Sequence, residues 1–228
     1  MKIRKYLMGY DSYERHRMVA KLVEPESRSI LDVGGGHKQL AQFINKTIIS
    51  ANLQEGDVRA SGLYLPFSDS AFDTVTSLDV LEHVPPGQRC AFVKELVRVC
   101  RNQVVVCAPY GSAEHMAGEK ILLDRILREG SVDKMLEEHV ENGLPKMDTF
   151  KSCLSEQISI QAWFSGYYQY NIFCFHVDHL FGVDRFKWVK VFLAMFLNLF
   201  GNLVIFPISL SRLPRANANR MYVVLNKS

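Results

Sequence analysis

The chain has 228 residues, of which 48% are hydrophobic and 22% are charged. That length and composition suit one globular domain with a full core, and they exclude an intrinsically disordered chain. The net charge of +3 is too small to indicate nucleic-acid binding. It is unevenly placed, because residues 177–228 contain seven Lys and Arg against two Asp. This basic, apolar C-terminal region indicates a surface with a role of its own.

The cysteines and the first residues bear on the cellular compartment. The five cysteines are odd in number, include no C-x-x-C pair and lie within apolar segments. We therefore expect buried thiols in a reducing compartment. Residues 1–10 are basic and are interrupted by Gly9, without the apolar stretch of a signal peptide. The sequence thus predicts a cytoplasmic protein. The cysteines are Cys90, Cys100, Cys107, Cys153 and Cys174.

Residues 12–23 have the apolar spacing of a short amphipathic helix, which Asp11 or Ser12 would cap and Pro25 would end. Two roles for this helix remain open. It covers the edge of the sheet, or residues 1–24 form a lid over a bound ligand. The apolar face consists of Met18, Val19, Leu22 and Val23, and the lid would use Tyr13, His16 or Arg17.

Residues 29–36 are the stretch around which the rest of the chain is organised. An apolar strand ends on Asp32 and Val33 and breaks into three glycines, and residues 38–44 then read as a helix. A strand, a glycine turn and a helix build a nucleotide-sized site, because the backbone can approach a ligand closely there. The spacing does not fit a dinucleotide fingerprint, since Gln39 stands where that pattern needs its third glycine.

The same turn is similar to the acid-x-Gly-x-Gly turn of class I S-adenosylmethionine-dependent methyltransferases. This resemblance implies an α/β, Rossmann-like fold with a mostly parallel seven-stranded sheet and helices on both faces. It also implies S-adenosyl-L-methionine as the cofactor. The residues that the turn would bring to the cofactor are Asp32, Gly34, Gly35 and Gly36.

The next strand, residues 47–52, departs from the family at its end. The family places an acidic residue there to bind both ribose hydroxyls, and this chain has Asn52. An amide can still accept from one hydroxyl and donate to the other. Residues 53–56 leave room only for a turn before a very short strand at 57–60, so the family's helix is missing here. Glu55 and Asp57 in this turn are the alternative ribose ligands.

Residues 62–73 look like the family's loop that ends in Leu-Pro-Phe-x-Asp-x-Ser-Phe-Asp. In the family this loop reads the adenine. The resemblance implies that Ser61 meets the adenine amino group, and that the backbone of Gly62 and Leu63 binds the adenine edge. The alternative is an ordinary polar loop.

An apolar strand at 72–78 runs into Asp-Val-Leu-Glu-His at 79–83, which is similar to the same segment of type 11 methyltransferases. Ligands of open α/β sheets gather at the carboxyl ends of strands, so Leu78 and Asp79 should meet the cofactor. Asp79 and His83 are the candidate catalytic groups, because they would lie nearest the transferable methyl. His83 has an alternative structural role, anchoring the loop by hydrogen bonds. A helix at 86–100 and a strand at 103–108 follow, the helix with Phe92, Leu96, Val97 and Val99 turned inward.

The resemblance ends near Tyr110. The pairs Glu114-His115 and Glu138-His139 flank a charged helical stretch, but no H-x-x-x-H or H-E-x-x-H spacing occurs. We therefore predict no metal site, and we treat these side chains as candidates for acceptor contact. A helix at 150–155 and strands at 158–163 and 221–225 complete the chain, and in the family these two strands form the antiparallel end of the sheet.

The core fold does not explain residues 166–215, which we predict to be an apolar helical insertion. Residues 191–210 carry no charge and are flanked by basic residues. They are long enough to cross a bilayer, but both ends of the insertion would join the same sheet, which excludes a single span. An acceptor cap, peripheral membrane contact through residues 188–215, plain packing and a homodimer interface remain open. The basic flanks are Lys187, Lys190, Arg212 and Arg215.

The sequence thus predicts a single methyltransferase domain over residues 1–228. Its expected reaction is methylation of oxygen or nitrogen in a small-molecule or lipid- or sugar-linked acceptor, with no nucleic-acid partner. We expect it in the cytoplasm, with the membrane contact left open. Two alternatives belong to other classes. A non-catalytic binding protein would fit Asn52, the missing helix and Lys38, which stands where a third glycine is common. A nucleotide-dependent oxidoreductase is disfavoured by the glycine spacing.

Overall fold

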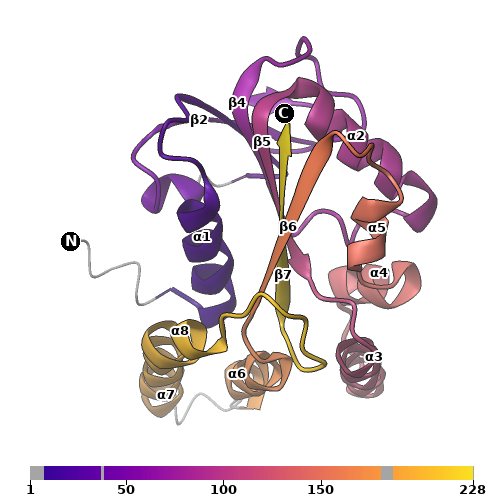
Figure 1. Ribbon diagram of the computed structural model, residues 1–228. Helices are drawn as coiled ribbons and strands as arrows, with labels where there is room; N and C mark the ends of the chain where they lie inside the picture. The colour runs from indigo at the N-terminus through magenta and orange to yellow at the C-terminus, as the bar shows by residue number, and fades with distance from the viewer. Residues whose placement is uncertain (1–7, 37–38, 181–186, 228) are drawn as a thin grey trace.

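The computed structural model describes residues 8–36, 39–180 and 187–227. Its centre is a seven-stranded sheet with the order β3-β2-β1-β4-β5-β7-β6 (Figure 1). The first five strands pair in parallel, and β7 lies antiparallel between β5 and β6. This sheet confirms the predicted fold class. The strands are β1 (Ser29–Val33), β2 (Thr47–Asn52), β3 (Val58–Arg59), β4 (Phe72–Leu78), β5 (Cys100–Pro109), β6 (Ile158–Ser165) and β7 (Arg220–Lys227).

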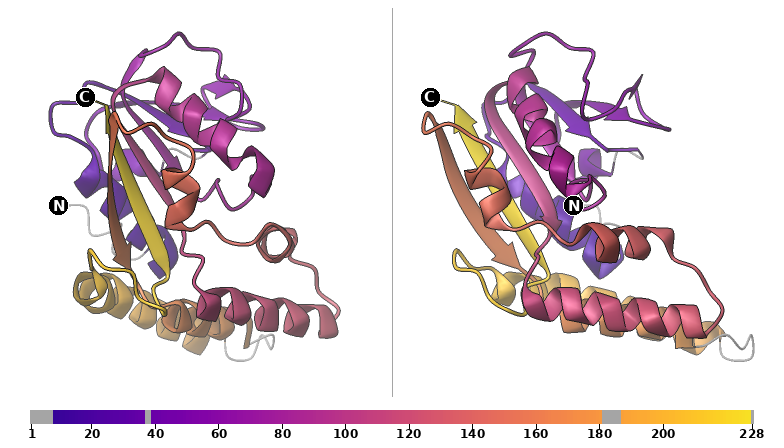
Figure 2. Two further views of the ribbon diagram at one scale, coloured as in Figure 1. Left: turned by 45° about the vertical axis from the view of Figure 1, so that its right-hand side comes forward. Right: turned by 90° about the vertical axis from the view of Figure 1, so that its right-hand side faces the viewer.

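Helices cover both faces and one end of the sheet. Helix α1 lies on one face, and α2 and α5 lie on the other (Figure 1). Helices α3, α6, α7 and α8 gather at one end of the strands, as both views of Figure 2 also show. The helices are α1 (Tyr10–Leu22), α2 (Arg89–Val99), α3 (Ala113–Arg128), α4 (Lys134–Asn142), α5 (Met147–Lys151), α6 (Tyr168–Leu180), α7 (Lys187–Phe200) and α8 (Phe206–Ser209), with a π-helical segment at Gly201–Ile205.

The two faces of the sheet bury separate cores, as the period of a strand requires. In β5, Val104 and Val106 pack with α2, whereas Val105 and Cys107 pack with α1. Both faces of this strand are covered, so it reads as a continuous apolar run. The predicted inward face of α2 is confirmed for Phe92, Leu96 and Val99, while Val97 is partly buried against the same core.

The segment after the glycine turn differs from the prediction. The expected helix over residues 38–44 is only a 3-10 turn at Leu40–Gln42, and Lys38 lies outside the described residues. Leu40 and Ile44 are both buried, and β2 begins at Thr47, so the chain turns back after about one turn of helix. The absence of a helix between β2 and β3 was predicted correctly.

Two other helix boundaries also differ. Helix α1 begins at Tyr10 after Gly9, without a side-chain cap, because the Asp11 carboxylate binds Arg220 instead. Helix α5 ends at Lys151, earlier than the predicted helix at 150–155. The strands β6 and β7 pair antiparallel along their length, as predicted.

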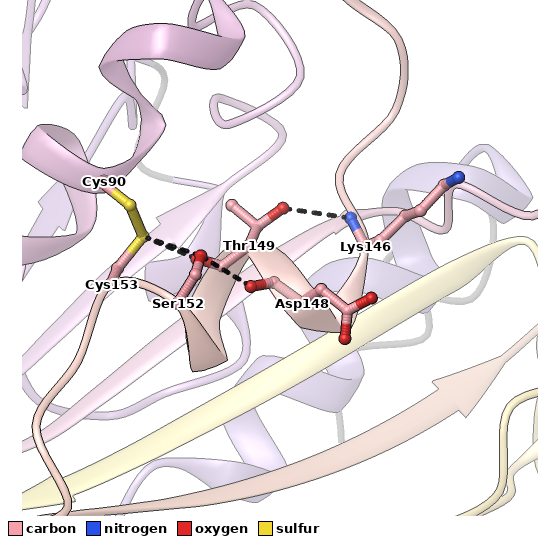
Figure 3. The surroundings of a disulfide bond; sticks show 6 residues. All are labelled: Cys90, Lys146, Asp148, Thr149, Ser152 and Cys153. Carbon is pink, nitrogen blue, oxygen red and sulfur yellow. Dashed lines mark hydrogen bonds between the residues drawn. A yellow bond between two sulfur atoms is a disulfide. The ribbon is translucent and has the colours of Figure 1, made fainter.

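The cysteine prediction was wrong for two of the five residues. Cys90 of α2 and Cys153 beyond α5 form a disulfide across 63 residues of sequence, with their Cα atoms 5.1 Å apart (Figure 3). The spacing of the cysteines along the sequence could not reveal this pair, because the fold brings the two residues together. Cys100 and Cys107 are buried thiols, and Cys174 is half-buried. The disulfide ties the segment carrying α3, α4 and α5 to the helix that covers the sheet.

Reduction of this disulfide should lower the stability of the protein. A crosslink over a loop of this length restricts the unfolded chain, and removing it typically costs about 2–4 kcal/mol. We expect Cys90→Ala/Cys153→Ala to lose that amount of unfolding free energy in urea. The double variant Cys100→Ala/Cys107→Ala is not a control, because both thiols are in the core. The control compares wild type with and without reductant. Reduction should lower its unfolding free energy by the same amount as the double substitution. Equal stability of oxidised and reduced wild type would contradict it.

Candidate active site

A cleft of about 1050 Å³ lies at the carboxyl ends of β1, β2 and β4. Single-ligand pockets are usually no larger than about 1,000 Å³, so this cleft has room for a nucleoside cofactor and an acceptor together. One half is lined by the glycine turn and the β2–β3 turn, and the other by α3 and α4. Asp79, Glu82 and His83 line the region between these halves.

The glycine turn forms the floor of the first half. Gly34 has φ of +90° and a Cβ there would stand 2.1 Å from the Val80 side chain. A Cβ on Gly35 would stand 2.0 Å from the Asp32 carboxylate. A Cβ on Gly36 would meet nothing closer than 3.8 Å, the distance to the Asn52 amide. Gly36 is therefore the glycine whose missing side chain leaves space in the cleft.

Asp32 supports this turn from below. It is buried, and its carboxylate accepts a hydrogen bond of 2.9 Å from the Thr76 hydroxyl on β4. Burial raises the pKa of Asp32 to about 6, although the Thr76 bond opposes the rise. Asp32 is thus placed at the cleft, as predicted, with its carboxylate held beneath the glycines.

Asn52 ends β2 and lines the cleft, as the ribose prediction requires. Its Nδ2 donates to the Gly34 carbonyl at 2.8 Å, and its Oδ1 accepts from the Gln54 amide at 3.0 Å. Of the two alternative ligands, Glu55 also lines the cleft. Asp57 instead accepts from the amide and hydroxyl of Ser50, both at 3.0 Å. Glu55 is therefore the carboxylate placed to assist Asn52.

Replacing Asn52 should weaken S-adenosylmethionine binding. Asn52→Ala removes a ribose partner and the brace on Gly34, and an unpaired buried polar group costs about 1–3 kcal/mol. Asn52→Asp should not restore the affinity, because it replaces the donor to the Gly34 carbonyl with a carboxylate. Calorimetry of both variants beside Asp57→Asn, whose contacts lie on Ser50, checks this. If Asn52→Ala binds the cofactor with wild-type affinity and Glu55→Gln binds it less tightly, then Glu55 is the residue that contacts the ribose.

The loop after β3 contains three predicted adenine contacts, and they differ in whether they line the cleft. Gly62 lines the cleft, together with Ala60. Ser61 forms an isolated bridge with Tyr64, and its hydroxyl accepts from the Leu63 amide at 3.2 Å. Ser61 and Leu63 are not among the cleft-lining residues of the described chain, so Gly62 is the member of the three with direct access.

Asp79 follows β4 and is the centre of a buried ion network. It has φ of +51°, and its carboxylate accepts from Arg15 of α1 and from Arg220 of β7. Arg220 also donates to both carboxylate oxygens of Asp11, at 2.6 and 2.7 Å. Burial alone would raise the pKa of Asp11, but the Arg220 and Arg15 charges hold it below its ordinary value. Leu78, the last residue of β4, lines the same wall.

His83 lies on the acceptor side of Asp79, in a group of carboxylates and imidazoles. Its Nδ1 donates to Glu138 of α4 at 2.7 Å, and its ring centroid is 4.9 Å from that of His139. His139 in turn donates from Nδ1 to Glu119 of α3 at 3.1 Å. These contacts agree with the anchoring role, and they leave the second nitrogen of each ring available. The predicted acceptor-side residues His115 and His139 both line the cleft.

Glu82 lies beside this group and is almost fully buried, with 1% of its surface exposed. Burial, with a smaller contribution from Asp79, raises the pKa of Glu82 to about 8. The pKa of Glu119 falls to about 2, because hydrogen bonds from His115 and His139 outweigh the effect of burial. Burial would lower the pKa of His139, but its bond to Glu119 and the charges of Glu119, Glu82 and Asp79 raise it.

Helix α1 contributes to the cleft through residues that differ in part from the predicted lid. His16 lines the cleft, as do Asp11 and Arg15. Tyr13 is instead buried in the core, and Arg17 is not among the lining residues. The sequence interpretation did not identify Arg15, Arg220 or Glu82. Glu82 was visible within the Asp-Val-Leu-Glu-His segment, whereas the pairing of residues 11, 15 and 220 depends on the tertiary fold.

Known proteins resemble this chain in sequence. A family model described as a methyltransferase domain matches residues 31–108. An uncharacterized methyltransferase from Mycobacterium sp. (strain JLS) is 31% identical over 131 residues, covering 46% of this chain and 51% of the relative. The chain therefore spans about half the length of the curated relatives it matches.

Solved structures share the fold. A possible histamine N-methyltransferase from Thermotoga maritima superposes with a TM-score of 0.57 at 14% identity, covering 99% of this chain and 92% of that one. Phosphoethanolamine N-methyltransferase 2 from Haemonchus contortus, in complex with S-adenosyl-L-methionine, gives 0.51 at 11% identity, covering 93% and 52%. Residues 31–108 thus resemble a methyltransferase domain in sequence, and the chain shares the fold of S-adenosylmethionine-dependent methyltransferases.

Proposed function

We propose that this protein transfers the methyl group of S-adenosylmethionine to an oxygen or nitrogen of a lipid-linked acceptor at a membrane surface. The observation that carries the proposal is a cleft whose glycine-lined half suits the cofactor and which α6 separates from an exposed apolar helix. A free small molecule as the acceptor is the alternative outcome of the experiment below.

The cleft has the groups that this chemistry needs. S-adenosylmethionine supplies a methyl on a sulfonium, which is already strongly electrophilic. The glycine turn and Asn52 would hold its nucleoside part, and the wall at Leu78 and Asp79 would bound its other end. The protein must then align the acceptor atom with the methyl and, for some acceptors, remove a proton. His83 remains a candidate for that proton, since its Nδ1 bond to Glu138 leaves the other ring nitrogen available.

The helix formed by α7, Gly201–Ile205 and α8 supports a membrane-linked acceptor. Within Val191–Ser209, an 18-residue window has a mean hydropathy of 2.1, and only 17% of that window is buried. The polar groups of this helix face the protein. Asn198 accepts from the Tyr10 amide at 2.8 Å, and Asn202 donates to the Met8 carbonyl at 3.0 Å. The outward stripe is apolar: Val189, Phe192, Phe196, Leu199, Leu203 and Ile208 are all exposed.

An apolar face turned outward suits a helix that lies in the membrane interface. By length and composition this helix could also cross a bilayer. Its contacts with residues 8 and 10 and the pairing of Ser211 with Phe164 of β6 hold it along the domain instead. It adjoins the cleft through α6, where Tyr170 donates to the Leu197 carbonyl and Asn171 lines the cleft. Arg212, which follows α8, is exposed and lies over the Trp163 ring of β6, while the side chains of Lys187 and Lys190 lie outside the described part.

Methyl transfer can be tested with S-adenosylmethionine carrying a labelled methyl group. The protein is incubated with either a total lipid extract or a fraction of water-soluble metabolites. We expect label in the organic phase and formation of S-adenosylhomocysteine, both absent with Gly36→Val. Label only in the soluble fraction would make the acceptor a small molecule. S-adenosylmethionine binding without product in either fraction would favour a non-catalytic binding protein.

Membrane contact can be tested by co-sedimentation with vesicles. Wild type should pellet with anionic vesicles more than with neutral ones and should be released by salt or carbonate. Phe196→Asp should abolish pelleting without a loss of stability, because its side chain is 64% exposed. Tyr64→Asp, at an 82% exposed aromatic in the loop after β3, is the matched control. A protein that stays in solution with every lipid, or a dimer that Phe196→Asp dissociates, would overturn this part of the proposal.

A further inference from the structure

Glu82, His83 and His139 bring one carboxylate and two imidazoles together at the boundary of the two halves of the cleft. Their potential ligand atoms all lie within 4.8 Å of one another. The sequence spacing gave no sign of this group, because His139 comes from α4 and the other two follow β4. We propose that these three side chains bind a divalent transition-metal ion of the zinc or manganese type. This proposal departs from the prediction that the chain has no metal site.

The two histidines are already oriented for this role. In metal sites, a ligating imidazole usually donates its other N–H to a carboxylate, which fixes the ring and its tautomer. His83 makes that bond through Nδ1 to Glu138 at 2.7 Å, and His139 makes it through Nδ1 to Glu119 at 3.1 Å. With Nδ1 protonated, the lone pair of each ring is on Nε2. Both rings therefore have an acceptor nitrogen for a cation.

Glu82 supplies an independent observation. Its side chain is 1% exposed, and its Oε2 has no hydrogen-bond partner among residues 8–36, 39–180 and 187–227. A buried carboxylate oxygen without a donor is costly unless a cation is bound to it or the acid is protonated. The arginines near Glu82 donate hydrogen bonds to groups other than its carboxylate. Arg220 and Arg15 bind Asp79, and Arg89 donates to the backbone carbonyls of residues 82, 84, 142 and 143.

The fold holds the three ligands in place. The Arg89 bonds join the end of α4 to the segment that carries Glu82 and His83. Two imidazoles and one carboxylate leave coordination positions open, which is typical of catalytic rather than structural sites. We infer that the open positions face the cleft, because all three residues line it. There the ion would bind and polarise an acceptor oxygen, and His83 would then serve as a ligand rather than as the base. This last step rests on the proposed function, whereas the metal site itself does not.

Metal binding can be measured on the full chain after removal of bound metal with a chelator. Calorimetric titration with Zn²⁺, and separately with Mn²⁺, should show one site per chain for at least one of them. Glu82→Gln and His139→Gln should each weaken that binding by about 100-fold or more, at least the loss typical of outer-shell partners. Glu141→Gln, an exposed carboxylate on the same helix α4, is the matched control and should bind like wild type. The ion should also raise the melting temperature of wild type and not that of Glu82→Gln.

The outcomes separate this proposal from the methyltransferase one. If the metal-free protein binds neither ion, or if both variants bind like wild type, the metal site is overturned. Glu82 would then be a neutral buried acid at pH 7. S-adenosylmethionine binding is titrated in the same metal-free protein, and its presence or absence is read independently. Should the cofactor bind while the metal does not, only the further inference fails.

Discussion

Gly36→Val should abolish S-adenosylmethionine binding while the protein remains folded. A side chain at this position would extend into the cleft beside Asn52 and Glu55, the nearest atoms to its Cβ at 3.8–4.0 Å. The valine would therefore occupy volume that the cofactor needs. We expect a loss of about 100-fold or more, equivalent to about 2.8 kcal/mol or more of binding free energy. Calorimetry with the cofactor measures it, and circular dichroism checks the fold.

The matched control is Gly87→Val, at an exposed glycine whose Cβ would meet nothing within 4 Å. It should bind the cofactor like wild type. Gly34→Val, in the same turn, is not a clean test of cofactor binding. The positive φ of Gly34 and the overlap with Val80 predict a loss of stability there. If Gly36→Val is folded and binds the cofactor with wild-type affinity, then the cofactor does not bind at this turn.

Arg220→Met should be the most destabilising of the single substitutions considered. It removes one of the two guanidinium groups that join the Asp11 and Asp79 carboxylates, at a side chain only 5% exposed, and leaves Arg15 as their remaining arginine partner. Breaking a buried ion pair on one side typically costs about 3–5 kcal/mol, because a charge is left uncompensated. Urea denaturation at pH 7 measures the loss. Arg101→Met is the control, since the Arg101–Asp73 pair is 55% exposed at the arginine and should cost less than about 1 kcal/mol.

Two further measurements identify the cause of that loss. Adding Asp11→Asn to Arg220→Met should recover part of the stability, because it removes one of the uncompensated charges. The pKa of Asp11 in the folded protein is held below its ordinary value, so its contribution is present above about pH 4 and is lost as the pH falls further. The difference between wild type and Arg220→Met should therefore shrink in acid. A constant difference at all pH values would indicate lost packing rather than charge.

The sequence predicted the parallel sheet well because its strands are apolar runs that end in polar or glycine signals. Asp32, Gly36, Asn52 and Asp79 all lie at the cleft for this reason. Each follows or ends a strand, and parallel strands bring their carboxyl ends to one edge. The short β3 and the missing helix before it could also be predicted, since the turn at 53–56 leaves no room for more.

Other parts of the site could not be predicted from local pattern. Arg220 pairs with Asp11 across almost the whole chain, and a single sequence has no signal for such a contact. The same is true of His139 beside Glu82, and of the disulfide between Cys90 and Cys153. The helix at 187–209 was visible as an uncharged run, but which of its faces is outward depends on the contacts of Asn198 and Asn202 with the N-terminal segment.

The most direct test of the central claim is a calorimetric titration of the purified wild-type protein with S-adenosylmethionine, S-adenosylhomocysteine and NAD. The glycine turn, the Asn52 end of β2 and the cleft volume predict one site per chain for the first two ligands and no binding of NAD. Binding of NAD in their place would make the chain a nucleotide-dependent oxidoreductase. If neither sulfur-containing ligand binds to the folded protein, the cleft is not a cofactor site and the proposed methyl transfer is wrong.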